Sequence, residues 1–249
     1  MKLNFTGCTD PGLIRSNNQD AYHIDPEGRF FIVADGMGGH AGGEQASRIA
    51  TQEIQNYLLT NWHSSISASK LLEKALWSAN QAILQDQQKH PERADMGTTV
   101  VVVVFRSSEP PICGHVGDSR LYRLRESQLV QITEDHTWIA RAIKIGDMTA
   151  DEARVHPYRH VLSRCLGRDD LHQLDLQPLD VKVGDRLLLC SDGLTEELVD
   201  QQICIYLQDT SSSDQPNLDK TAFSLVEAAK DEGGHDNITV ILIAVEENS

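Results

Sequence analysis

Four aspartates occur where apolar, strand-like runs of the sequence end or begin. Asp35 ends the run FFIVAD, Asp118 follows PICGHVG, Asp192 ends RLLLCSD, and Asp236 precedes NITVILIAV. Each Asp-Gly or Gly-Asp step alone is typical of a turn or a helix cap. Four acids in the same context indicate a shared site, because an ionised carboxylate near a core is costly unless it is paired or bound to a cation. If these strand ends meet at one rim, their oxygens suit a hard cation such as Mg²⁺ or Mn²⁺.

The stretch DGMGGHAGG, residues 35–43, places five glycines in the eight residues after Asp35. Bare backbone at Gly36 would let its carbonyl approach a cation that Asp35 holds. A dinucleotide-binding loop is disfavoured, because Asp35 would direct negative charge at a pyrophosphate and a helical pattern, not a strand, follows. The chain has no GxxxxGK(S/T) motif, which excludes a P-loop.

Composition narrows the possible functions. The chain has 249 residues, 40% of them hydrophobic, and a formal charge of −15, which disfavours nucleic acid as a partner. Its five cysteines are widely spread without a CxxC motif, so we expect free buried thiols, not disulfides or a thiolate zinc site. No run approaches the roughly 18 apolar residues of a membrane span, and no signal peptide is evident, which predicts a cytoplasmic protein and no membrane partner. The acidic surface and the absence of a heptad favour a monomer.

The pattern of apolar residues predicts an α+β fold. Helical spacing occurs over residues 46–58 and 72–83 and again in TAFSLVEAAKDE. Runs rich in β-branched residues predict strands starting at Arg29, Gly97, Pro111, Gln128, Asp185 and Asn237. Several of these runs are apolar throughout, which predicts strands covered on both faces. Because strands first pair as hairpins in the middle of the chain, a layered sandwich is favoured over a doubly wound parallel sheet.

The sequence resembles the metal-dependent Ser/Thr protein phosphatases of type 2C, in their compact bacterial form. The matching stretches, in the family's order, are GLIRSNNQDAY, FIVADGMGGHAGGEQAS, MGTTVVVVV, GHVGDSRLYRL, ITEDHTW, HPYRHVLSRCLG, LLLCSDGLTEEL and GGHDNITVILI. The resemblance covers nearly the whole chain. It implies a four-layer α-β-β-α sandwich, a single catalytic domain over residues 1–249, and a flap at about residues 136–165 beside the active site.

The resemblance also implies how the acids share the metal ions, Mn²⁺ or Mg²⁺. Asp35 would bridge two ions, and the Gly36 carbonyl would complete the second. Asp192 and Asp236 would hold the first ion. Asp118 would hold a third, weaker ion that it shares with Asp192. In the family, a water that bridges two divalent ions attacks phosphorus in line.

Four further residues receive roles from the resemblance. Arg15 would bind the substrate phosphate, Asp20 would orient a metal-bound water, and Asn237 would support the site. His40 would act as the general acid that protonates the leaving serine or threonine oxygen. Gln19 stands where some eukaryotic members have a glutamate, so direct coordination from this motif is not expected to carry over.

The resemblance implies a signalling enzyme that hydrolyses phosphoserine and phosphothreonine on proteins. Two alternatives stay open: a catalytically inactive relative that binds phosphoproteins, and a hydrolase of small phosphoesters that shares the same site. Inactive relatives usually lack metal aspartates, and none is missing here. In the flap, His160 departs from the commoner HPxxN form, and Arg164 or Arg168 are candidate phosphate or peptide contacts.

Overall fold

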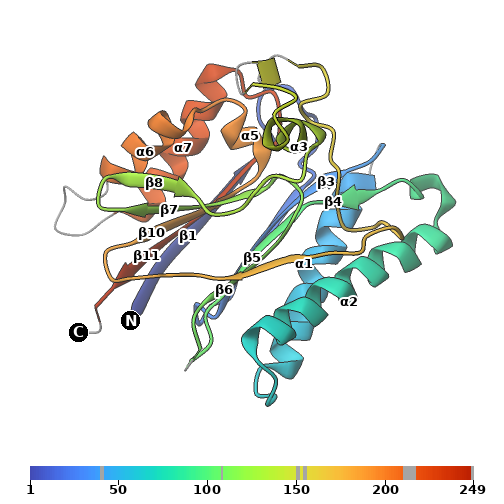
Figure 1. The fold of residues 1–249 in the computed structure, drawn as a ribbon, viewed down its shortest axis with the longest axis horizontal. Helices are drawn as coiled ribbons and strands as arrows, with labels where there is room; N and C mark the ends of the chain where they lie inside the picture. Colours follow the sequence, from blue (N-terminus) through green and yellow to red (C-terminus); the bar gives the residue numbers. More distant parts are fainter. Residues whose placement is uncertain (40–41, 108, 150–151, 154–155, 210–216, 248–249) are drawn as a thin grey trace.

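The chain folds into two antiparallel β-sheets that pack face to face, with helices on both outer faces (Figure 1). The structure is a computed structural model and describes residues 1–39, 42–107, 109–149, 152–153, 156–209 and 217–247. The first sheet has the strand order β1 (Lys2–Asp10), β11 (Ile238–Glu246), β10 (Arg186–Cys190), β7 (Arg120–Arg125) and β8 (Gln128–Gln131). The second has the order β2 (Asp20–Ile24), β3 (Phe30–Met37), β5 (Val100–Val104), β6 (Ile112–Val116) and β9 (Asp175–Pro178), and the short β4 (Gly97–Thr98) pairs with β3.

The helices form the two outer layers. One outer face carries α1 (Gly42–Asn61) and α2 (Ala68–Lys89), and the other carries α5 (Asp192–Thr195), α6 (Asp200–Asp209) and α7 (Leu218–Glu232) (Figure 1). The 3₁₀ turn η1 (Pro91–Arg93) follows α2, and α3 (Trp138–Lys144) lies in the segment that was predicted to be a flap. Side-chain caps fix where helices begin: Ser67 accepts from the Lys70 amide at α2, and Thr137 accepts from the Ala140 amide at α3. Among the described residues, no helix combines the length and apolarity needed to cross a membrane.

The strand β5 explains why a run of valines suits this architecture. All five of its valines are buried, and because side chains alternate across a strand they divide between two cores. Val101 and Val103 pack between the sheets, whereas Val100, Val102 and Val104 pack under α1 and α2. The continuous apolar run was predicted to mark a strand covered on both faces, and the structure confirms this.

The other sheet repeats the arrangement. On β10, Leu187 and Leu189 face the partner sheet, whereas Leu188 and Cys190 face the helices α5, α6 and α7. Three separate apolar cores therefore hold four layers together, which confirms the predicted four-layer α-β-β-α sandwich.

The run PICGHVGDSRLYRL divides into β6 and β7, which belong to different sheets. The chain crosses from one sheet to the other at Gly117, whose φ of +107° is one that side-chain-bearing residues rarely adopt. Asp118 follows at this crossing. The ends of β3, β6 and β10 and the start of β11 thus reach the same rim of the sandwich, and this rim brings the four aspartates together.

The core between the sheets gives a test of the layered architecture. We expect Leu189→Ala to lower the free energy of unfolding by about 2–5 kcal/mol, because the side chain is fully buried and its loss leaves a cavity between the sheets. Ile205→Ala, on the exposed face of α6, is the control and is expected to change stability by less than about 0.5 kcal/mol. Denaturant unfolding followed by circular dichroism measures both, and equal effects would contradict the assignment of this core.

Candidate metal centre and active site

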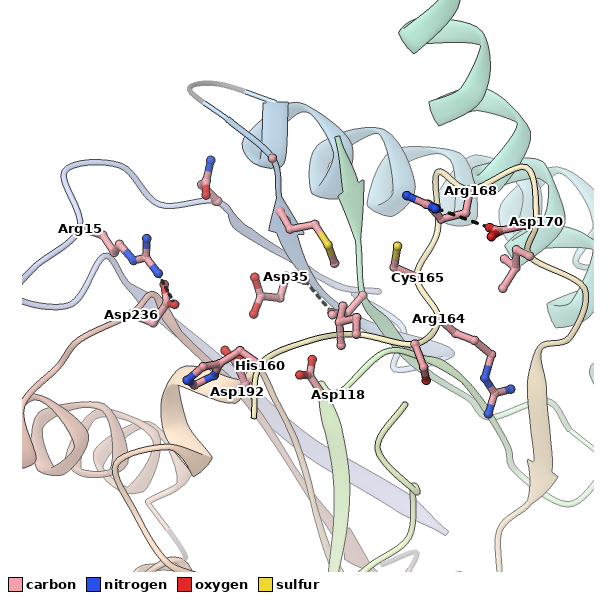
Figure 2. A pocket seen from close by; sticks show the side chains of 18 residues that line it. Arg15, Asp35, Asp118, His160, Arg164, Cys165, Arg168, Asp170, Asp192 and Asp236 are labelled. Carbon is pink, nitrogen blue, oxygen red and sulfur yellow. Dashed lines mark hydrogen bonds and ion pairs between the residues drawn. The ribbon is translucent and has the colours of Figure 1, made fainter. Parts of the chain in front are cut away.

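A cavity of about 510 Å³ opens at the rim where the strand ends meet (Figure 2). Carboxylates from four separate segments of the chain lie around it, which is the convergence that the strand-end pattern predicted. Of the site residues predicted from the sequence, those that line the cavity are Arg15, Asp35, Gly36, Asp118, Asp192 and Asp236.

Asp20 lies behind the cavity, in β2, directly opposite Asp35 in the register of β2 and β3. Its Oδ2 accepts hydrogen bonds from Ser191 Oγ at 2.7 Å and from Thr239 Oγ1 at 2.6 Å. Two neutral hydroxyls thus fix one oxygen, while Oδ1 is buried without a partner in the described part of the chain. His40, the predicted general acid, lies outside the described residues.

The backbone around Asp35 is fixed by Thr99, a residue that the sequence analysis did not single out. The Asp35 amide donates to Thr99 Oγ1 at 3.0 Å, and the Thr99 amide donates to the Asp35 carbonyl at 2.8 Å. At Gly36, an added Cβ would lie 2.0 Å from the Gly43 carbonyl oxygen in the first turn of α1. Close packing against α1 therefore requires a glycine at this position. This reason is separate from the predicted approach of the Gly36 carbonyl to a cation.

Asn237, immediately before β11, is bonded to the loop of residues 11–19 beside Asp236. Its side-chain oxygen accepts from the Gln19 amide at 2.7 Å, and its side-chain nitrogen donates to the carbonyls of Pro11 and Asn17 at 3.0 and 2.9 Å. Asn237 does not line the cavity, and its bonds orient the loop that carries Arg15. The supporting role expected for Asn237 is consistent with these contacts.

The glycine after Asp192 has a steric cause. An added Cβ at Gly193 would lie 2.2 Å from the Asn237 carbonyl oxygen. The first turn of α5 can therefore approach β11 only without a side chain at this position, and that approach brings Asp192 beside Asp236 at the cavity.

Asp118 is the most deeply enclosed of the cavity's aspartates, with 8% of its surface exposed. The next residue, Ser119, is hydrogen-bonded through Oγ to Thr99 Oγ1 at 2.6 Å, so one threonine contacts both the Asp35 and the Asp118 segments. Arg120 forms a bidentate ion pair with Asp135, with N–O distances of 2.7–3.1 Å. These bonds hold the chain immediately after Asp118.

Burial and the neighbouring acids favour the protonated forms of Asp20, Asp35, Asp118 and Asp192 when no cation is bound. Burial raises the pKa of Asp20 to about 7, and burial together with the neighbouring acids raises the pKa of Asp35, Asp118 and Asp192 above the usual range. Asp192 Oδ1 is buried without a partner among the described residues, as is Oδ1 of Asp20. An all-oxygen donor set with unsatisfied buried atoms and excess negative charge fits hard divalent cations.

Arg15 supplies positive charge at the edge of the cavity (Figure 2). Its Nη2 donates to Asp236 Oδ2 at 2.7 Å, and this bond raises the pKa of the guanidinium further. The side chain is 54% exposed, so Asp236 orients a group that solutes in the cavity can reach.

One wall of the cavity contains His160, which was predicted to lie in the flap, and beside it lies Glu196, which was not predicted. His160 lines the cavity and contacts Glu196 through Nδ1, and the two lie close to Asp192. Burial and the acids at 192 and 236 raise the pKa of Glu196 to about 8. The sequence analysis missed Glu196, although its spacing of four residues from Asp192 places both on one side of a helical turn.

Both candidate arginines line the cavity, and each has an acidic partner. Arg164 Nη1 donates to Asp175 at 2.8 Å, and Arg168 Nε lies 3.4 Å from Asp170. Figure 2 shows the two guanidinium groups on the side of the cavity away from Arg15. Their acidic partners neutralise part of their charge.

The fold and site match one family of enzymes. The sequence profile of the family described as protein phosphatase 2C matches residues 15–232. The chain is 34% identical to the serine/threonine protein phosphatase PstP of Mycobacterium tuberculosis, over 98% of this chain and 45% of PstP. It is also 34% identical to the protein phosphatase PhpP of Streptococcus pneumoniae, over 96% of each chain. A crystal structure of the PstP catalytic domain in complex with two manganese ions superposes with a TM-score of 0.85, at 32% identity, over 98% of this chain and 99% of that domain.

The chain therefore belongs to the protein phosphatase 2C family. It spans less than half the length of mycobacterial PstP and nearly the full length of pneumococcal PhpP. The two-manganese structure belongs to PstP, and its sandwich fold is the one described above.

The raised pKa values predict that cation binding releases protons. The metal-free acids hold protons that the cation must displace, so Mn²⁺ affinity is expected to rise as pH increases towards the pKa of about 7 at Asp20. Without a cation, the folded chain holds these protons to higher pH than the unfolded chain does. The acids with raised pKa values therefore make the metal-free protein less stable as pH rises from about 4 towards the pKa of about 7 at Asp20. These acids are Asp20, Asp35, Asp118 and Asp192.

Isothermal titration calorimetry of the metal-free protein with MnCl₂, in two buffers with different ionisation enthalpies, measures the proton release. The exposed Asp231→Asn variant is the control and is expected to behave as the wild type. Binding without proton release, at an affinity independent of pH, would contradict the assigned electrostatics.

Proposed function

We propose that this chain hydrolyses phosphoserine and phosphothreonine on proteins, using two Mn²⁺ or Mg²⁺ ions and a third, weaker one. The observation that carries the proposal is the convergence of Asp35, Asp118, Asp192 and Asp236 on one cavity, beside Arg15. The names of the relatives support the substrate class, and the all-oxygen donor set supports the choice of ions.

The proposed ligand roles are those that the resemblance to the family implies. Asp35, with the Gly36 carbonyl, would bridge two ions, while Asp192 and Asp236 would hold one of them; all four residues line the cavity. Asp118, which Figure 2 shows on the side of Asp35 away from Asp236, would hold the third ion together with Asp192. Divalent cations held in such a site supply positive charge to phosphoryl oxygens and acidify water.

The residues of the chain would position the substrate and move the protons. Arg15 would bind the phosphate, because the bond to Asp236 uses one of its five N–H donors and a guanidinium suits bidentate contact with phosphate oxygens. Asp20 would orient the attacking water through Oδ1, which has no partner among the described residues. His40 would donate a proton to the leaving oxygen, a role that imidazole suits near neutral pH.

The remaining predictions complete the proposal. We place one catalytic domain over residues 1–249, acting in the cytoplasm as a monomer in signal transduction. The segment at about residues 136–165 is proposed as a flap that tunes substrate access, since His160, Leu162, Ser163, Arg164 and Cys165 line the cavity. A catalytically inactive phosphoprotein-binding protein and a hydrolase of small phosphoesters are the alternatives that the following experiment separates.

Phosphatase activity is expected to require both a divalent cation and Asp192. We expect Mn²⁺-dependent release of phosphate from phosphoserine and phosphothreonine peptides. Asp192→Ala is expected to lower kcat/KM by at least about 100-fold. Losing a residue that only orients a metal ligand costs up to about 100-fold, and losing a ligand should cost at least as much. Asp231→Ala, on the exposed face of α7, should retain full activity.

The assay uses phosphopeptides and p-nitrophenyl phosphate in parallel, with Mn²⁺ or with a chelator. Turnover of the small ester alone would favour the small-phosphoester alternative. Binding of phosphopeptides without turnover would favour the inactive relative. Turnover in the presence of the chelator would contradict the metal-dependent mechanism.

Arg15 is expected to act on the substrate and not on the ions. Arg15→Lys keeps the charge but removes the bidentate fork, so kcat/KM for phosphopeptides should fall about 10–100-fold, equivalent to losing one charged hydrogen bond. Mn²⁺ affinity, measured by calorimetry, is expected to stay close to that of the wild type. Lys182→Arg, at an exposed ion pair remote from the cavity, is the matched control and should leave both quantities unchanged. Loss of Mn²⁺ binding in Arg15→Lys would instead give Arg15 a role in holding Asp236.

A further inference from the structure

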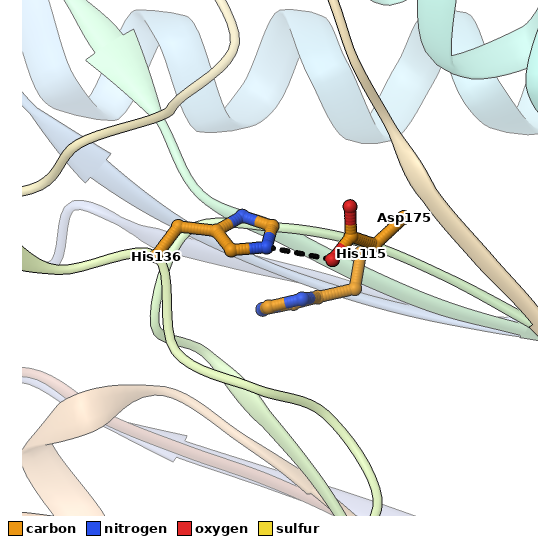
Figure 3. A group of neighbouring side chains, drawn as sticks. All are labelled: His115, His136 and Asp175. Carbon is orange, nitrogen blue, oxygen red and sulfur yellow. Dashed lines mark hydrogen bonds and ion pairs between the residues drawn. The ribbon is translucent and has the colours of Figure 1, made fainter. Parts of the chain in front are cut away.

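Behind the wall of the cavity, His136 joins the crossing that carries Asp118 to the segment that carries Arg164. The imidazole is buried, with 3% exposed, and lies among His115 and Asp175 (Figure 3). The proposed mechanism gives none of these three residues a role. They come from three separate places in the sequence, so their meeting is a property of the fold alone.

His136 holds the residue before Asp118 by two reciprocal bonds. The His136 amide donates to the Gly117 carbonyl at 2.8 Å, and the Gly117 amide donates to His136 Nδ1 at 3.1 Å. Gly117 is the residue at which the chain crosses between the sheets with a positive φ. The bonds therefore fix the backbone immediately in front of the Asp118 carboxylate.

The same histidine holds the wall of the cavity. Its carbonyl accepts from the Ser163 amide at 2.7 Å, and Ser163 lines the cavity. Its Nε2 lies 3.0 Å from Asp175 Oδ2, and the other oxygen of Asp175 accepts from Arg164 Nη1 at 2.8 Å. One buried ring thus connects Gly117 to Ser163 directly and to Arg164 through Asp175.

The bonds also determine where the proton of the ring lies. Because the Gly117 amide donates to Nδ1, that nitrogen carries a lone pair, and in the neutral ring the proton is on Nε2, where it is donated to Asp175. Burial and the nearby Arg164 lower the pKa of His136, so the neutral ring is favoured.

A cation between His115, His136 and Asp175 is the competing interpretation, since their ligand atoms lie within 4.8 Å of one another and His115 Nε2 has no partner among the described residues. The cation would need the lone pair of His136 Nε2. The ring proton would then move to Nδ1 and face the Gly117 N–H, placing two donors against each other. Arg164 also brings positive charge to Asp175. The bonding pattern disfavours a cation here.

We propose that His136, as the Nε2–H tautomer, is a positioning residue that couples the Asp118 crossing to the cavity wall at residues 161–164. Its partner Asp175 holds the ring and Arg164 at the same time. The inference rests on the proposed function only in taking Asp118 as a ligand of the weaker ion. Ligand-orienting partners of this kind typically contribute about 10–100-fold to metal affinity.

The tautomer is tested directly on the wild-type protein. Two-dimensional ¹H–¹⁵N NMR of the imidazole side chains, assigned by comparison with His136→Asn, is expected to show His136 with a protonated Nε2 and an unprotonated Nδ1. The pattern should persist in the metal-free and the Mn²⁺-loaded protein. A protonated Nδ1 would overturn the proposal, and the tautomer itself is read from the wild-type spectrum.

Calorimetric Mn²⁺ titrations of the metal-free variants test the coupling. His136→Ala is expected to weaken the weakest Mn²⁺-binding step by about 10–100-fold. His136→Asn places an amide oxygen where Nδ1 stands, and should recover most of that loss because it can again accept from Gly117. The exposed His172→Ala, close to Asp175 in the sequence, is the control and should bind Mn²⁺ as the wild type does.

Asp175→Asn separates the two ends of the coupling. The substitution leaves the bonds between His136 and Gly117 in place but removes the charge that holds Arg164. We therefore expect KM for phosphopeptides to change. Mn²⁺ affinity should stay within about threefold of the wild type, which is small compared with the effect of losing a ligand-orienting group. Amide hydrogen exchange should rise at 161–164 in this variant, and at both 117–119 and 161–164 in His136→Ala.

Besides a protonated Nδ1, three binding results would overturn the proposal: unchanged Mn²⁺ binding in His136→Ala, a loss in His136→Asn as large as in His136→Ala, or Zn²⁺ binding by the wild type that His115→Ala abolishes. Absence of phosphatase activity in a wild-type protein that binds Mn²⁺ and shows the predicted exchange pattern would overturn the proposed function and leave this coupling intact.

Discussion

Mutual repulsion among buried carboxylates is the constraint on which the rest of this structure depends. Asp20, Asp35, Asp118 and Asp192 lie close enough that neighbouring acids and burial raise the pKa of each. Such a cluster disfavours its own assembly, so the energy that holds it must come from elsewhere. Three apolar cores supply it, because each acid is the end of a strand or turn whose neighbours are buried.

At the rim, hydrogen bonds from neutral groups hold the acids in place in addition to the apolar cores. Thr99 contacts the segments of both Asp35 and Asp118, and Asn237 ties the loop of Arg15 to the start of β11. Hydroxyl and amide groups orient the acids without adding charge, so the cavity keeps the negative potential that favours cations. The close approaches at Gly36 and Gly193 belong to the same arrangement, since a side chain at either position would separate the segments that carry the acids.

The sequence predicted the fold best where burial left a strong pattern. The continuous apolar runs of β3, β5, β10 and β11 and the helical spacing in α1, α2 and α7 were all recognised. β1, β2 and β9 were not, because these strands are mostly half-buried and lack continuous apolar character. The short α3, α5 and α6 were also missed, since a few turns of helix leave little periodicity to read.

The predicted metal ligands could be found because strand ends and glycines mark them locally. The residues that orient them could not, since nothing in the sequence near Thr99 or His136 indicates partners many residues away. Glu196 lay within reach of the spacing argument and was overlooked. Residues that could bind a metal can be recognised from their neighbours in the sequence, whereas the hydrogen bonds that connect distant segments become visible only in the folded structure.

The pairing of β1 with β11 has a consequence for the biosynthesis of the protein. These strands hold the first and the last residues of the paired sheet next to each other, and Asn237 reaches back to Pro11 and Asn17. Asp236 and the anchor of the Arg15 loop therefore do not exist in a chain that is still being translated. A nascent chain cannot complete the cavity until β11 has emerged from the ribosome, so the proposed activity would be absent until that point of synthesis.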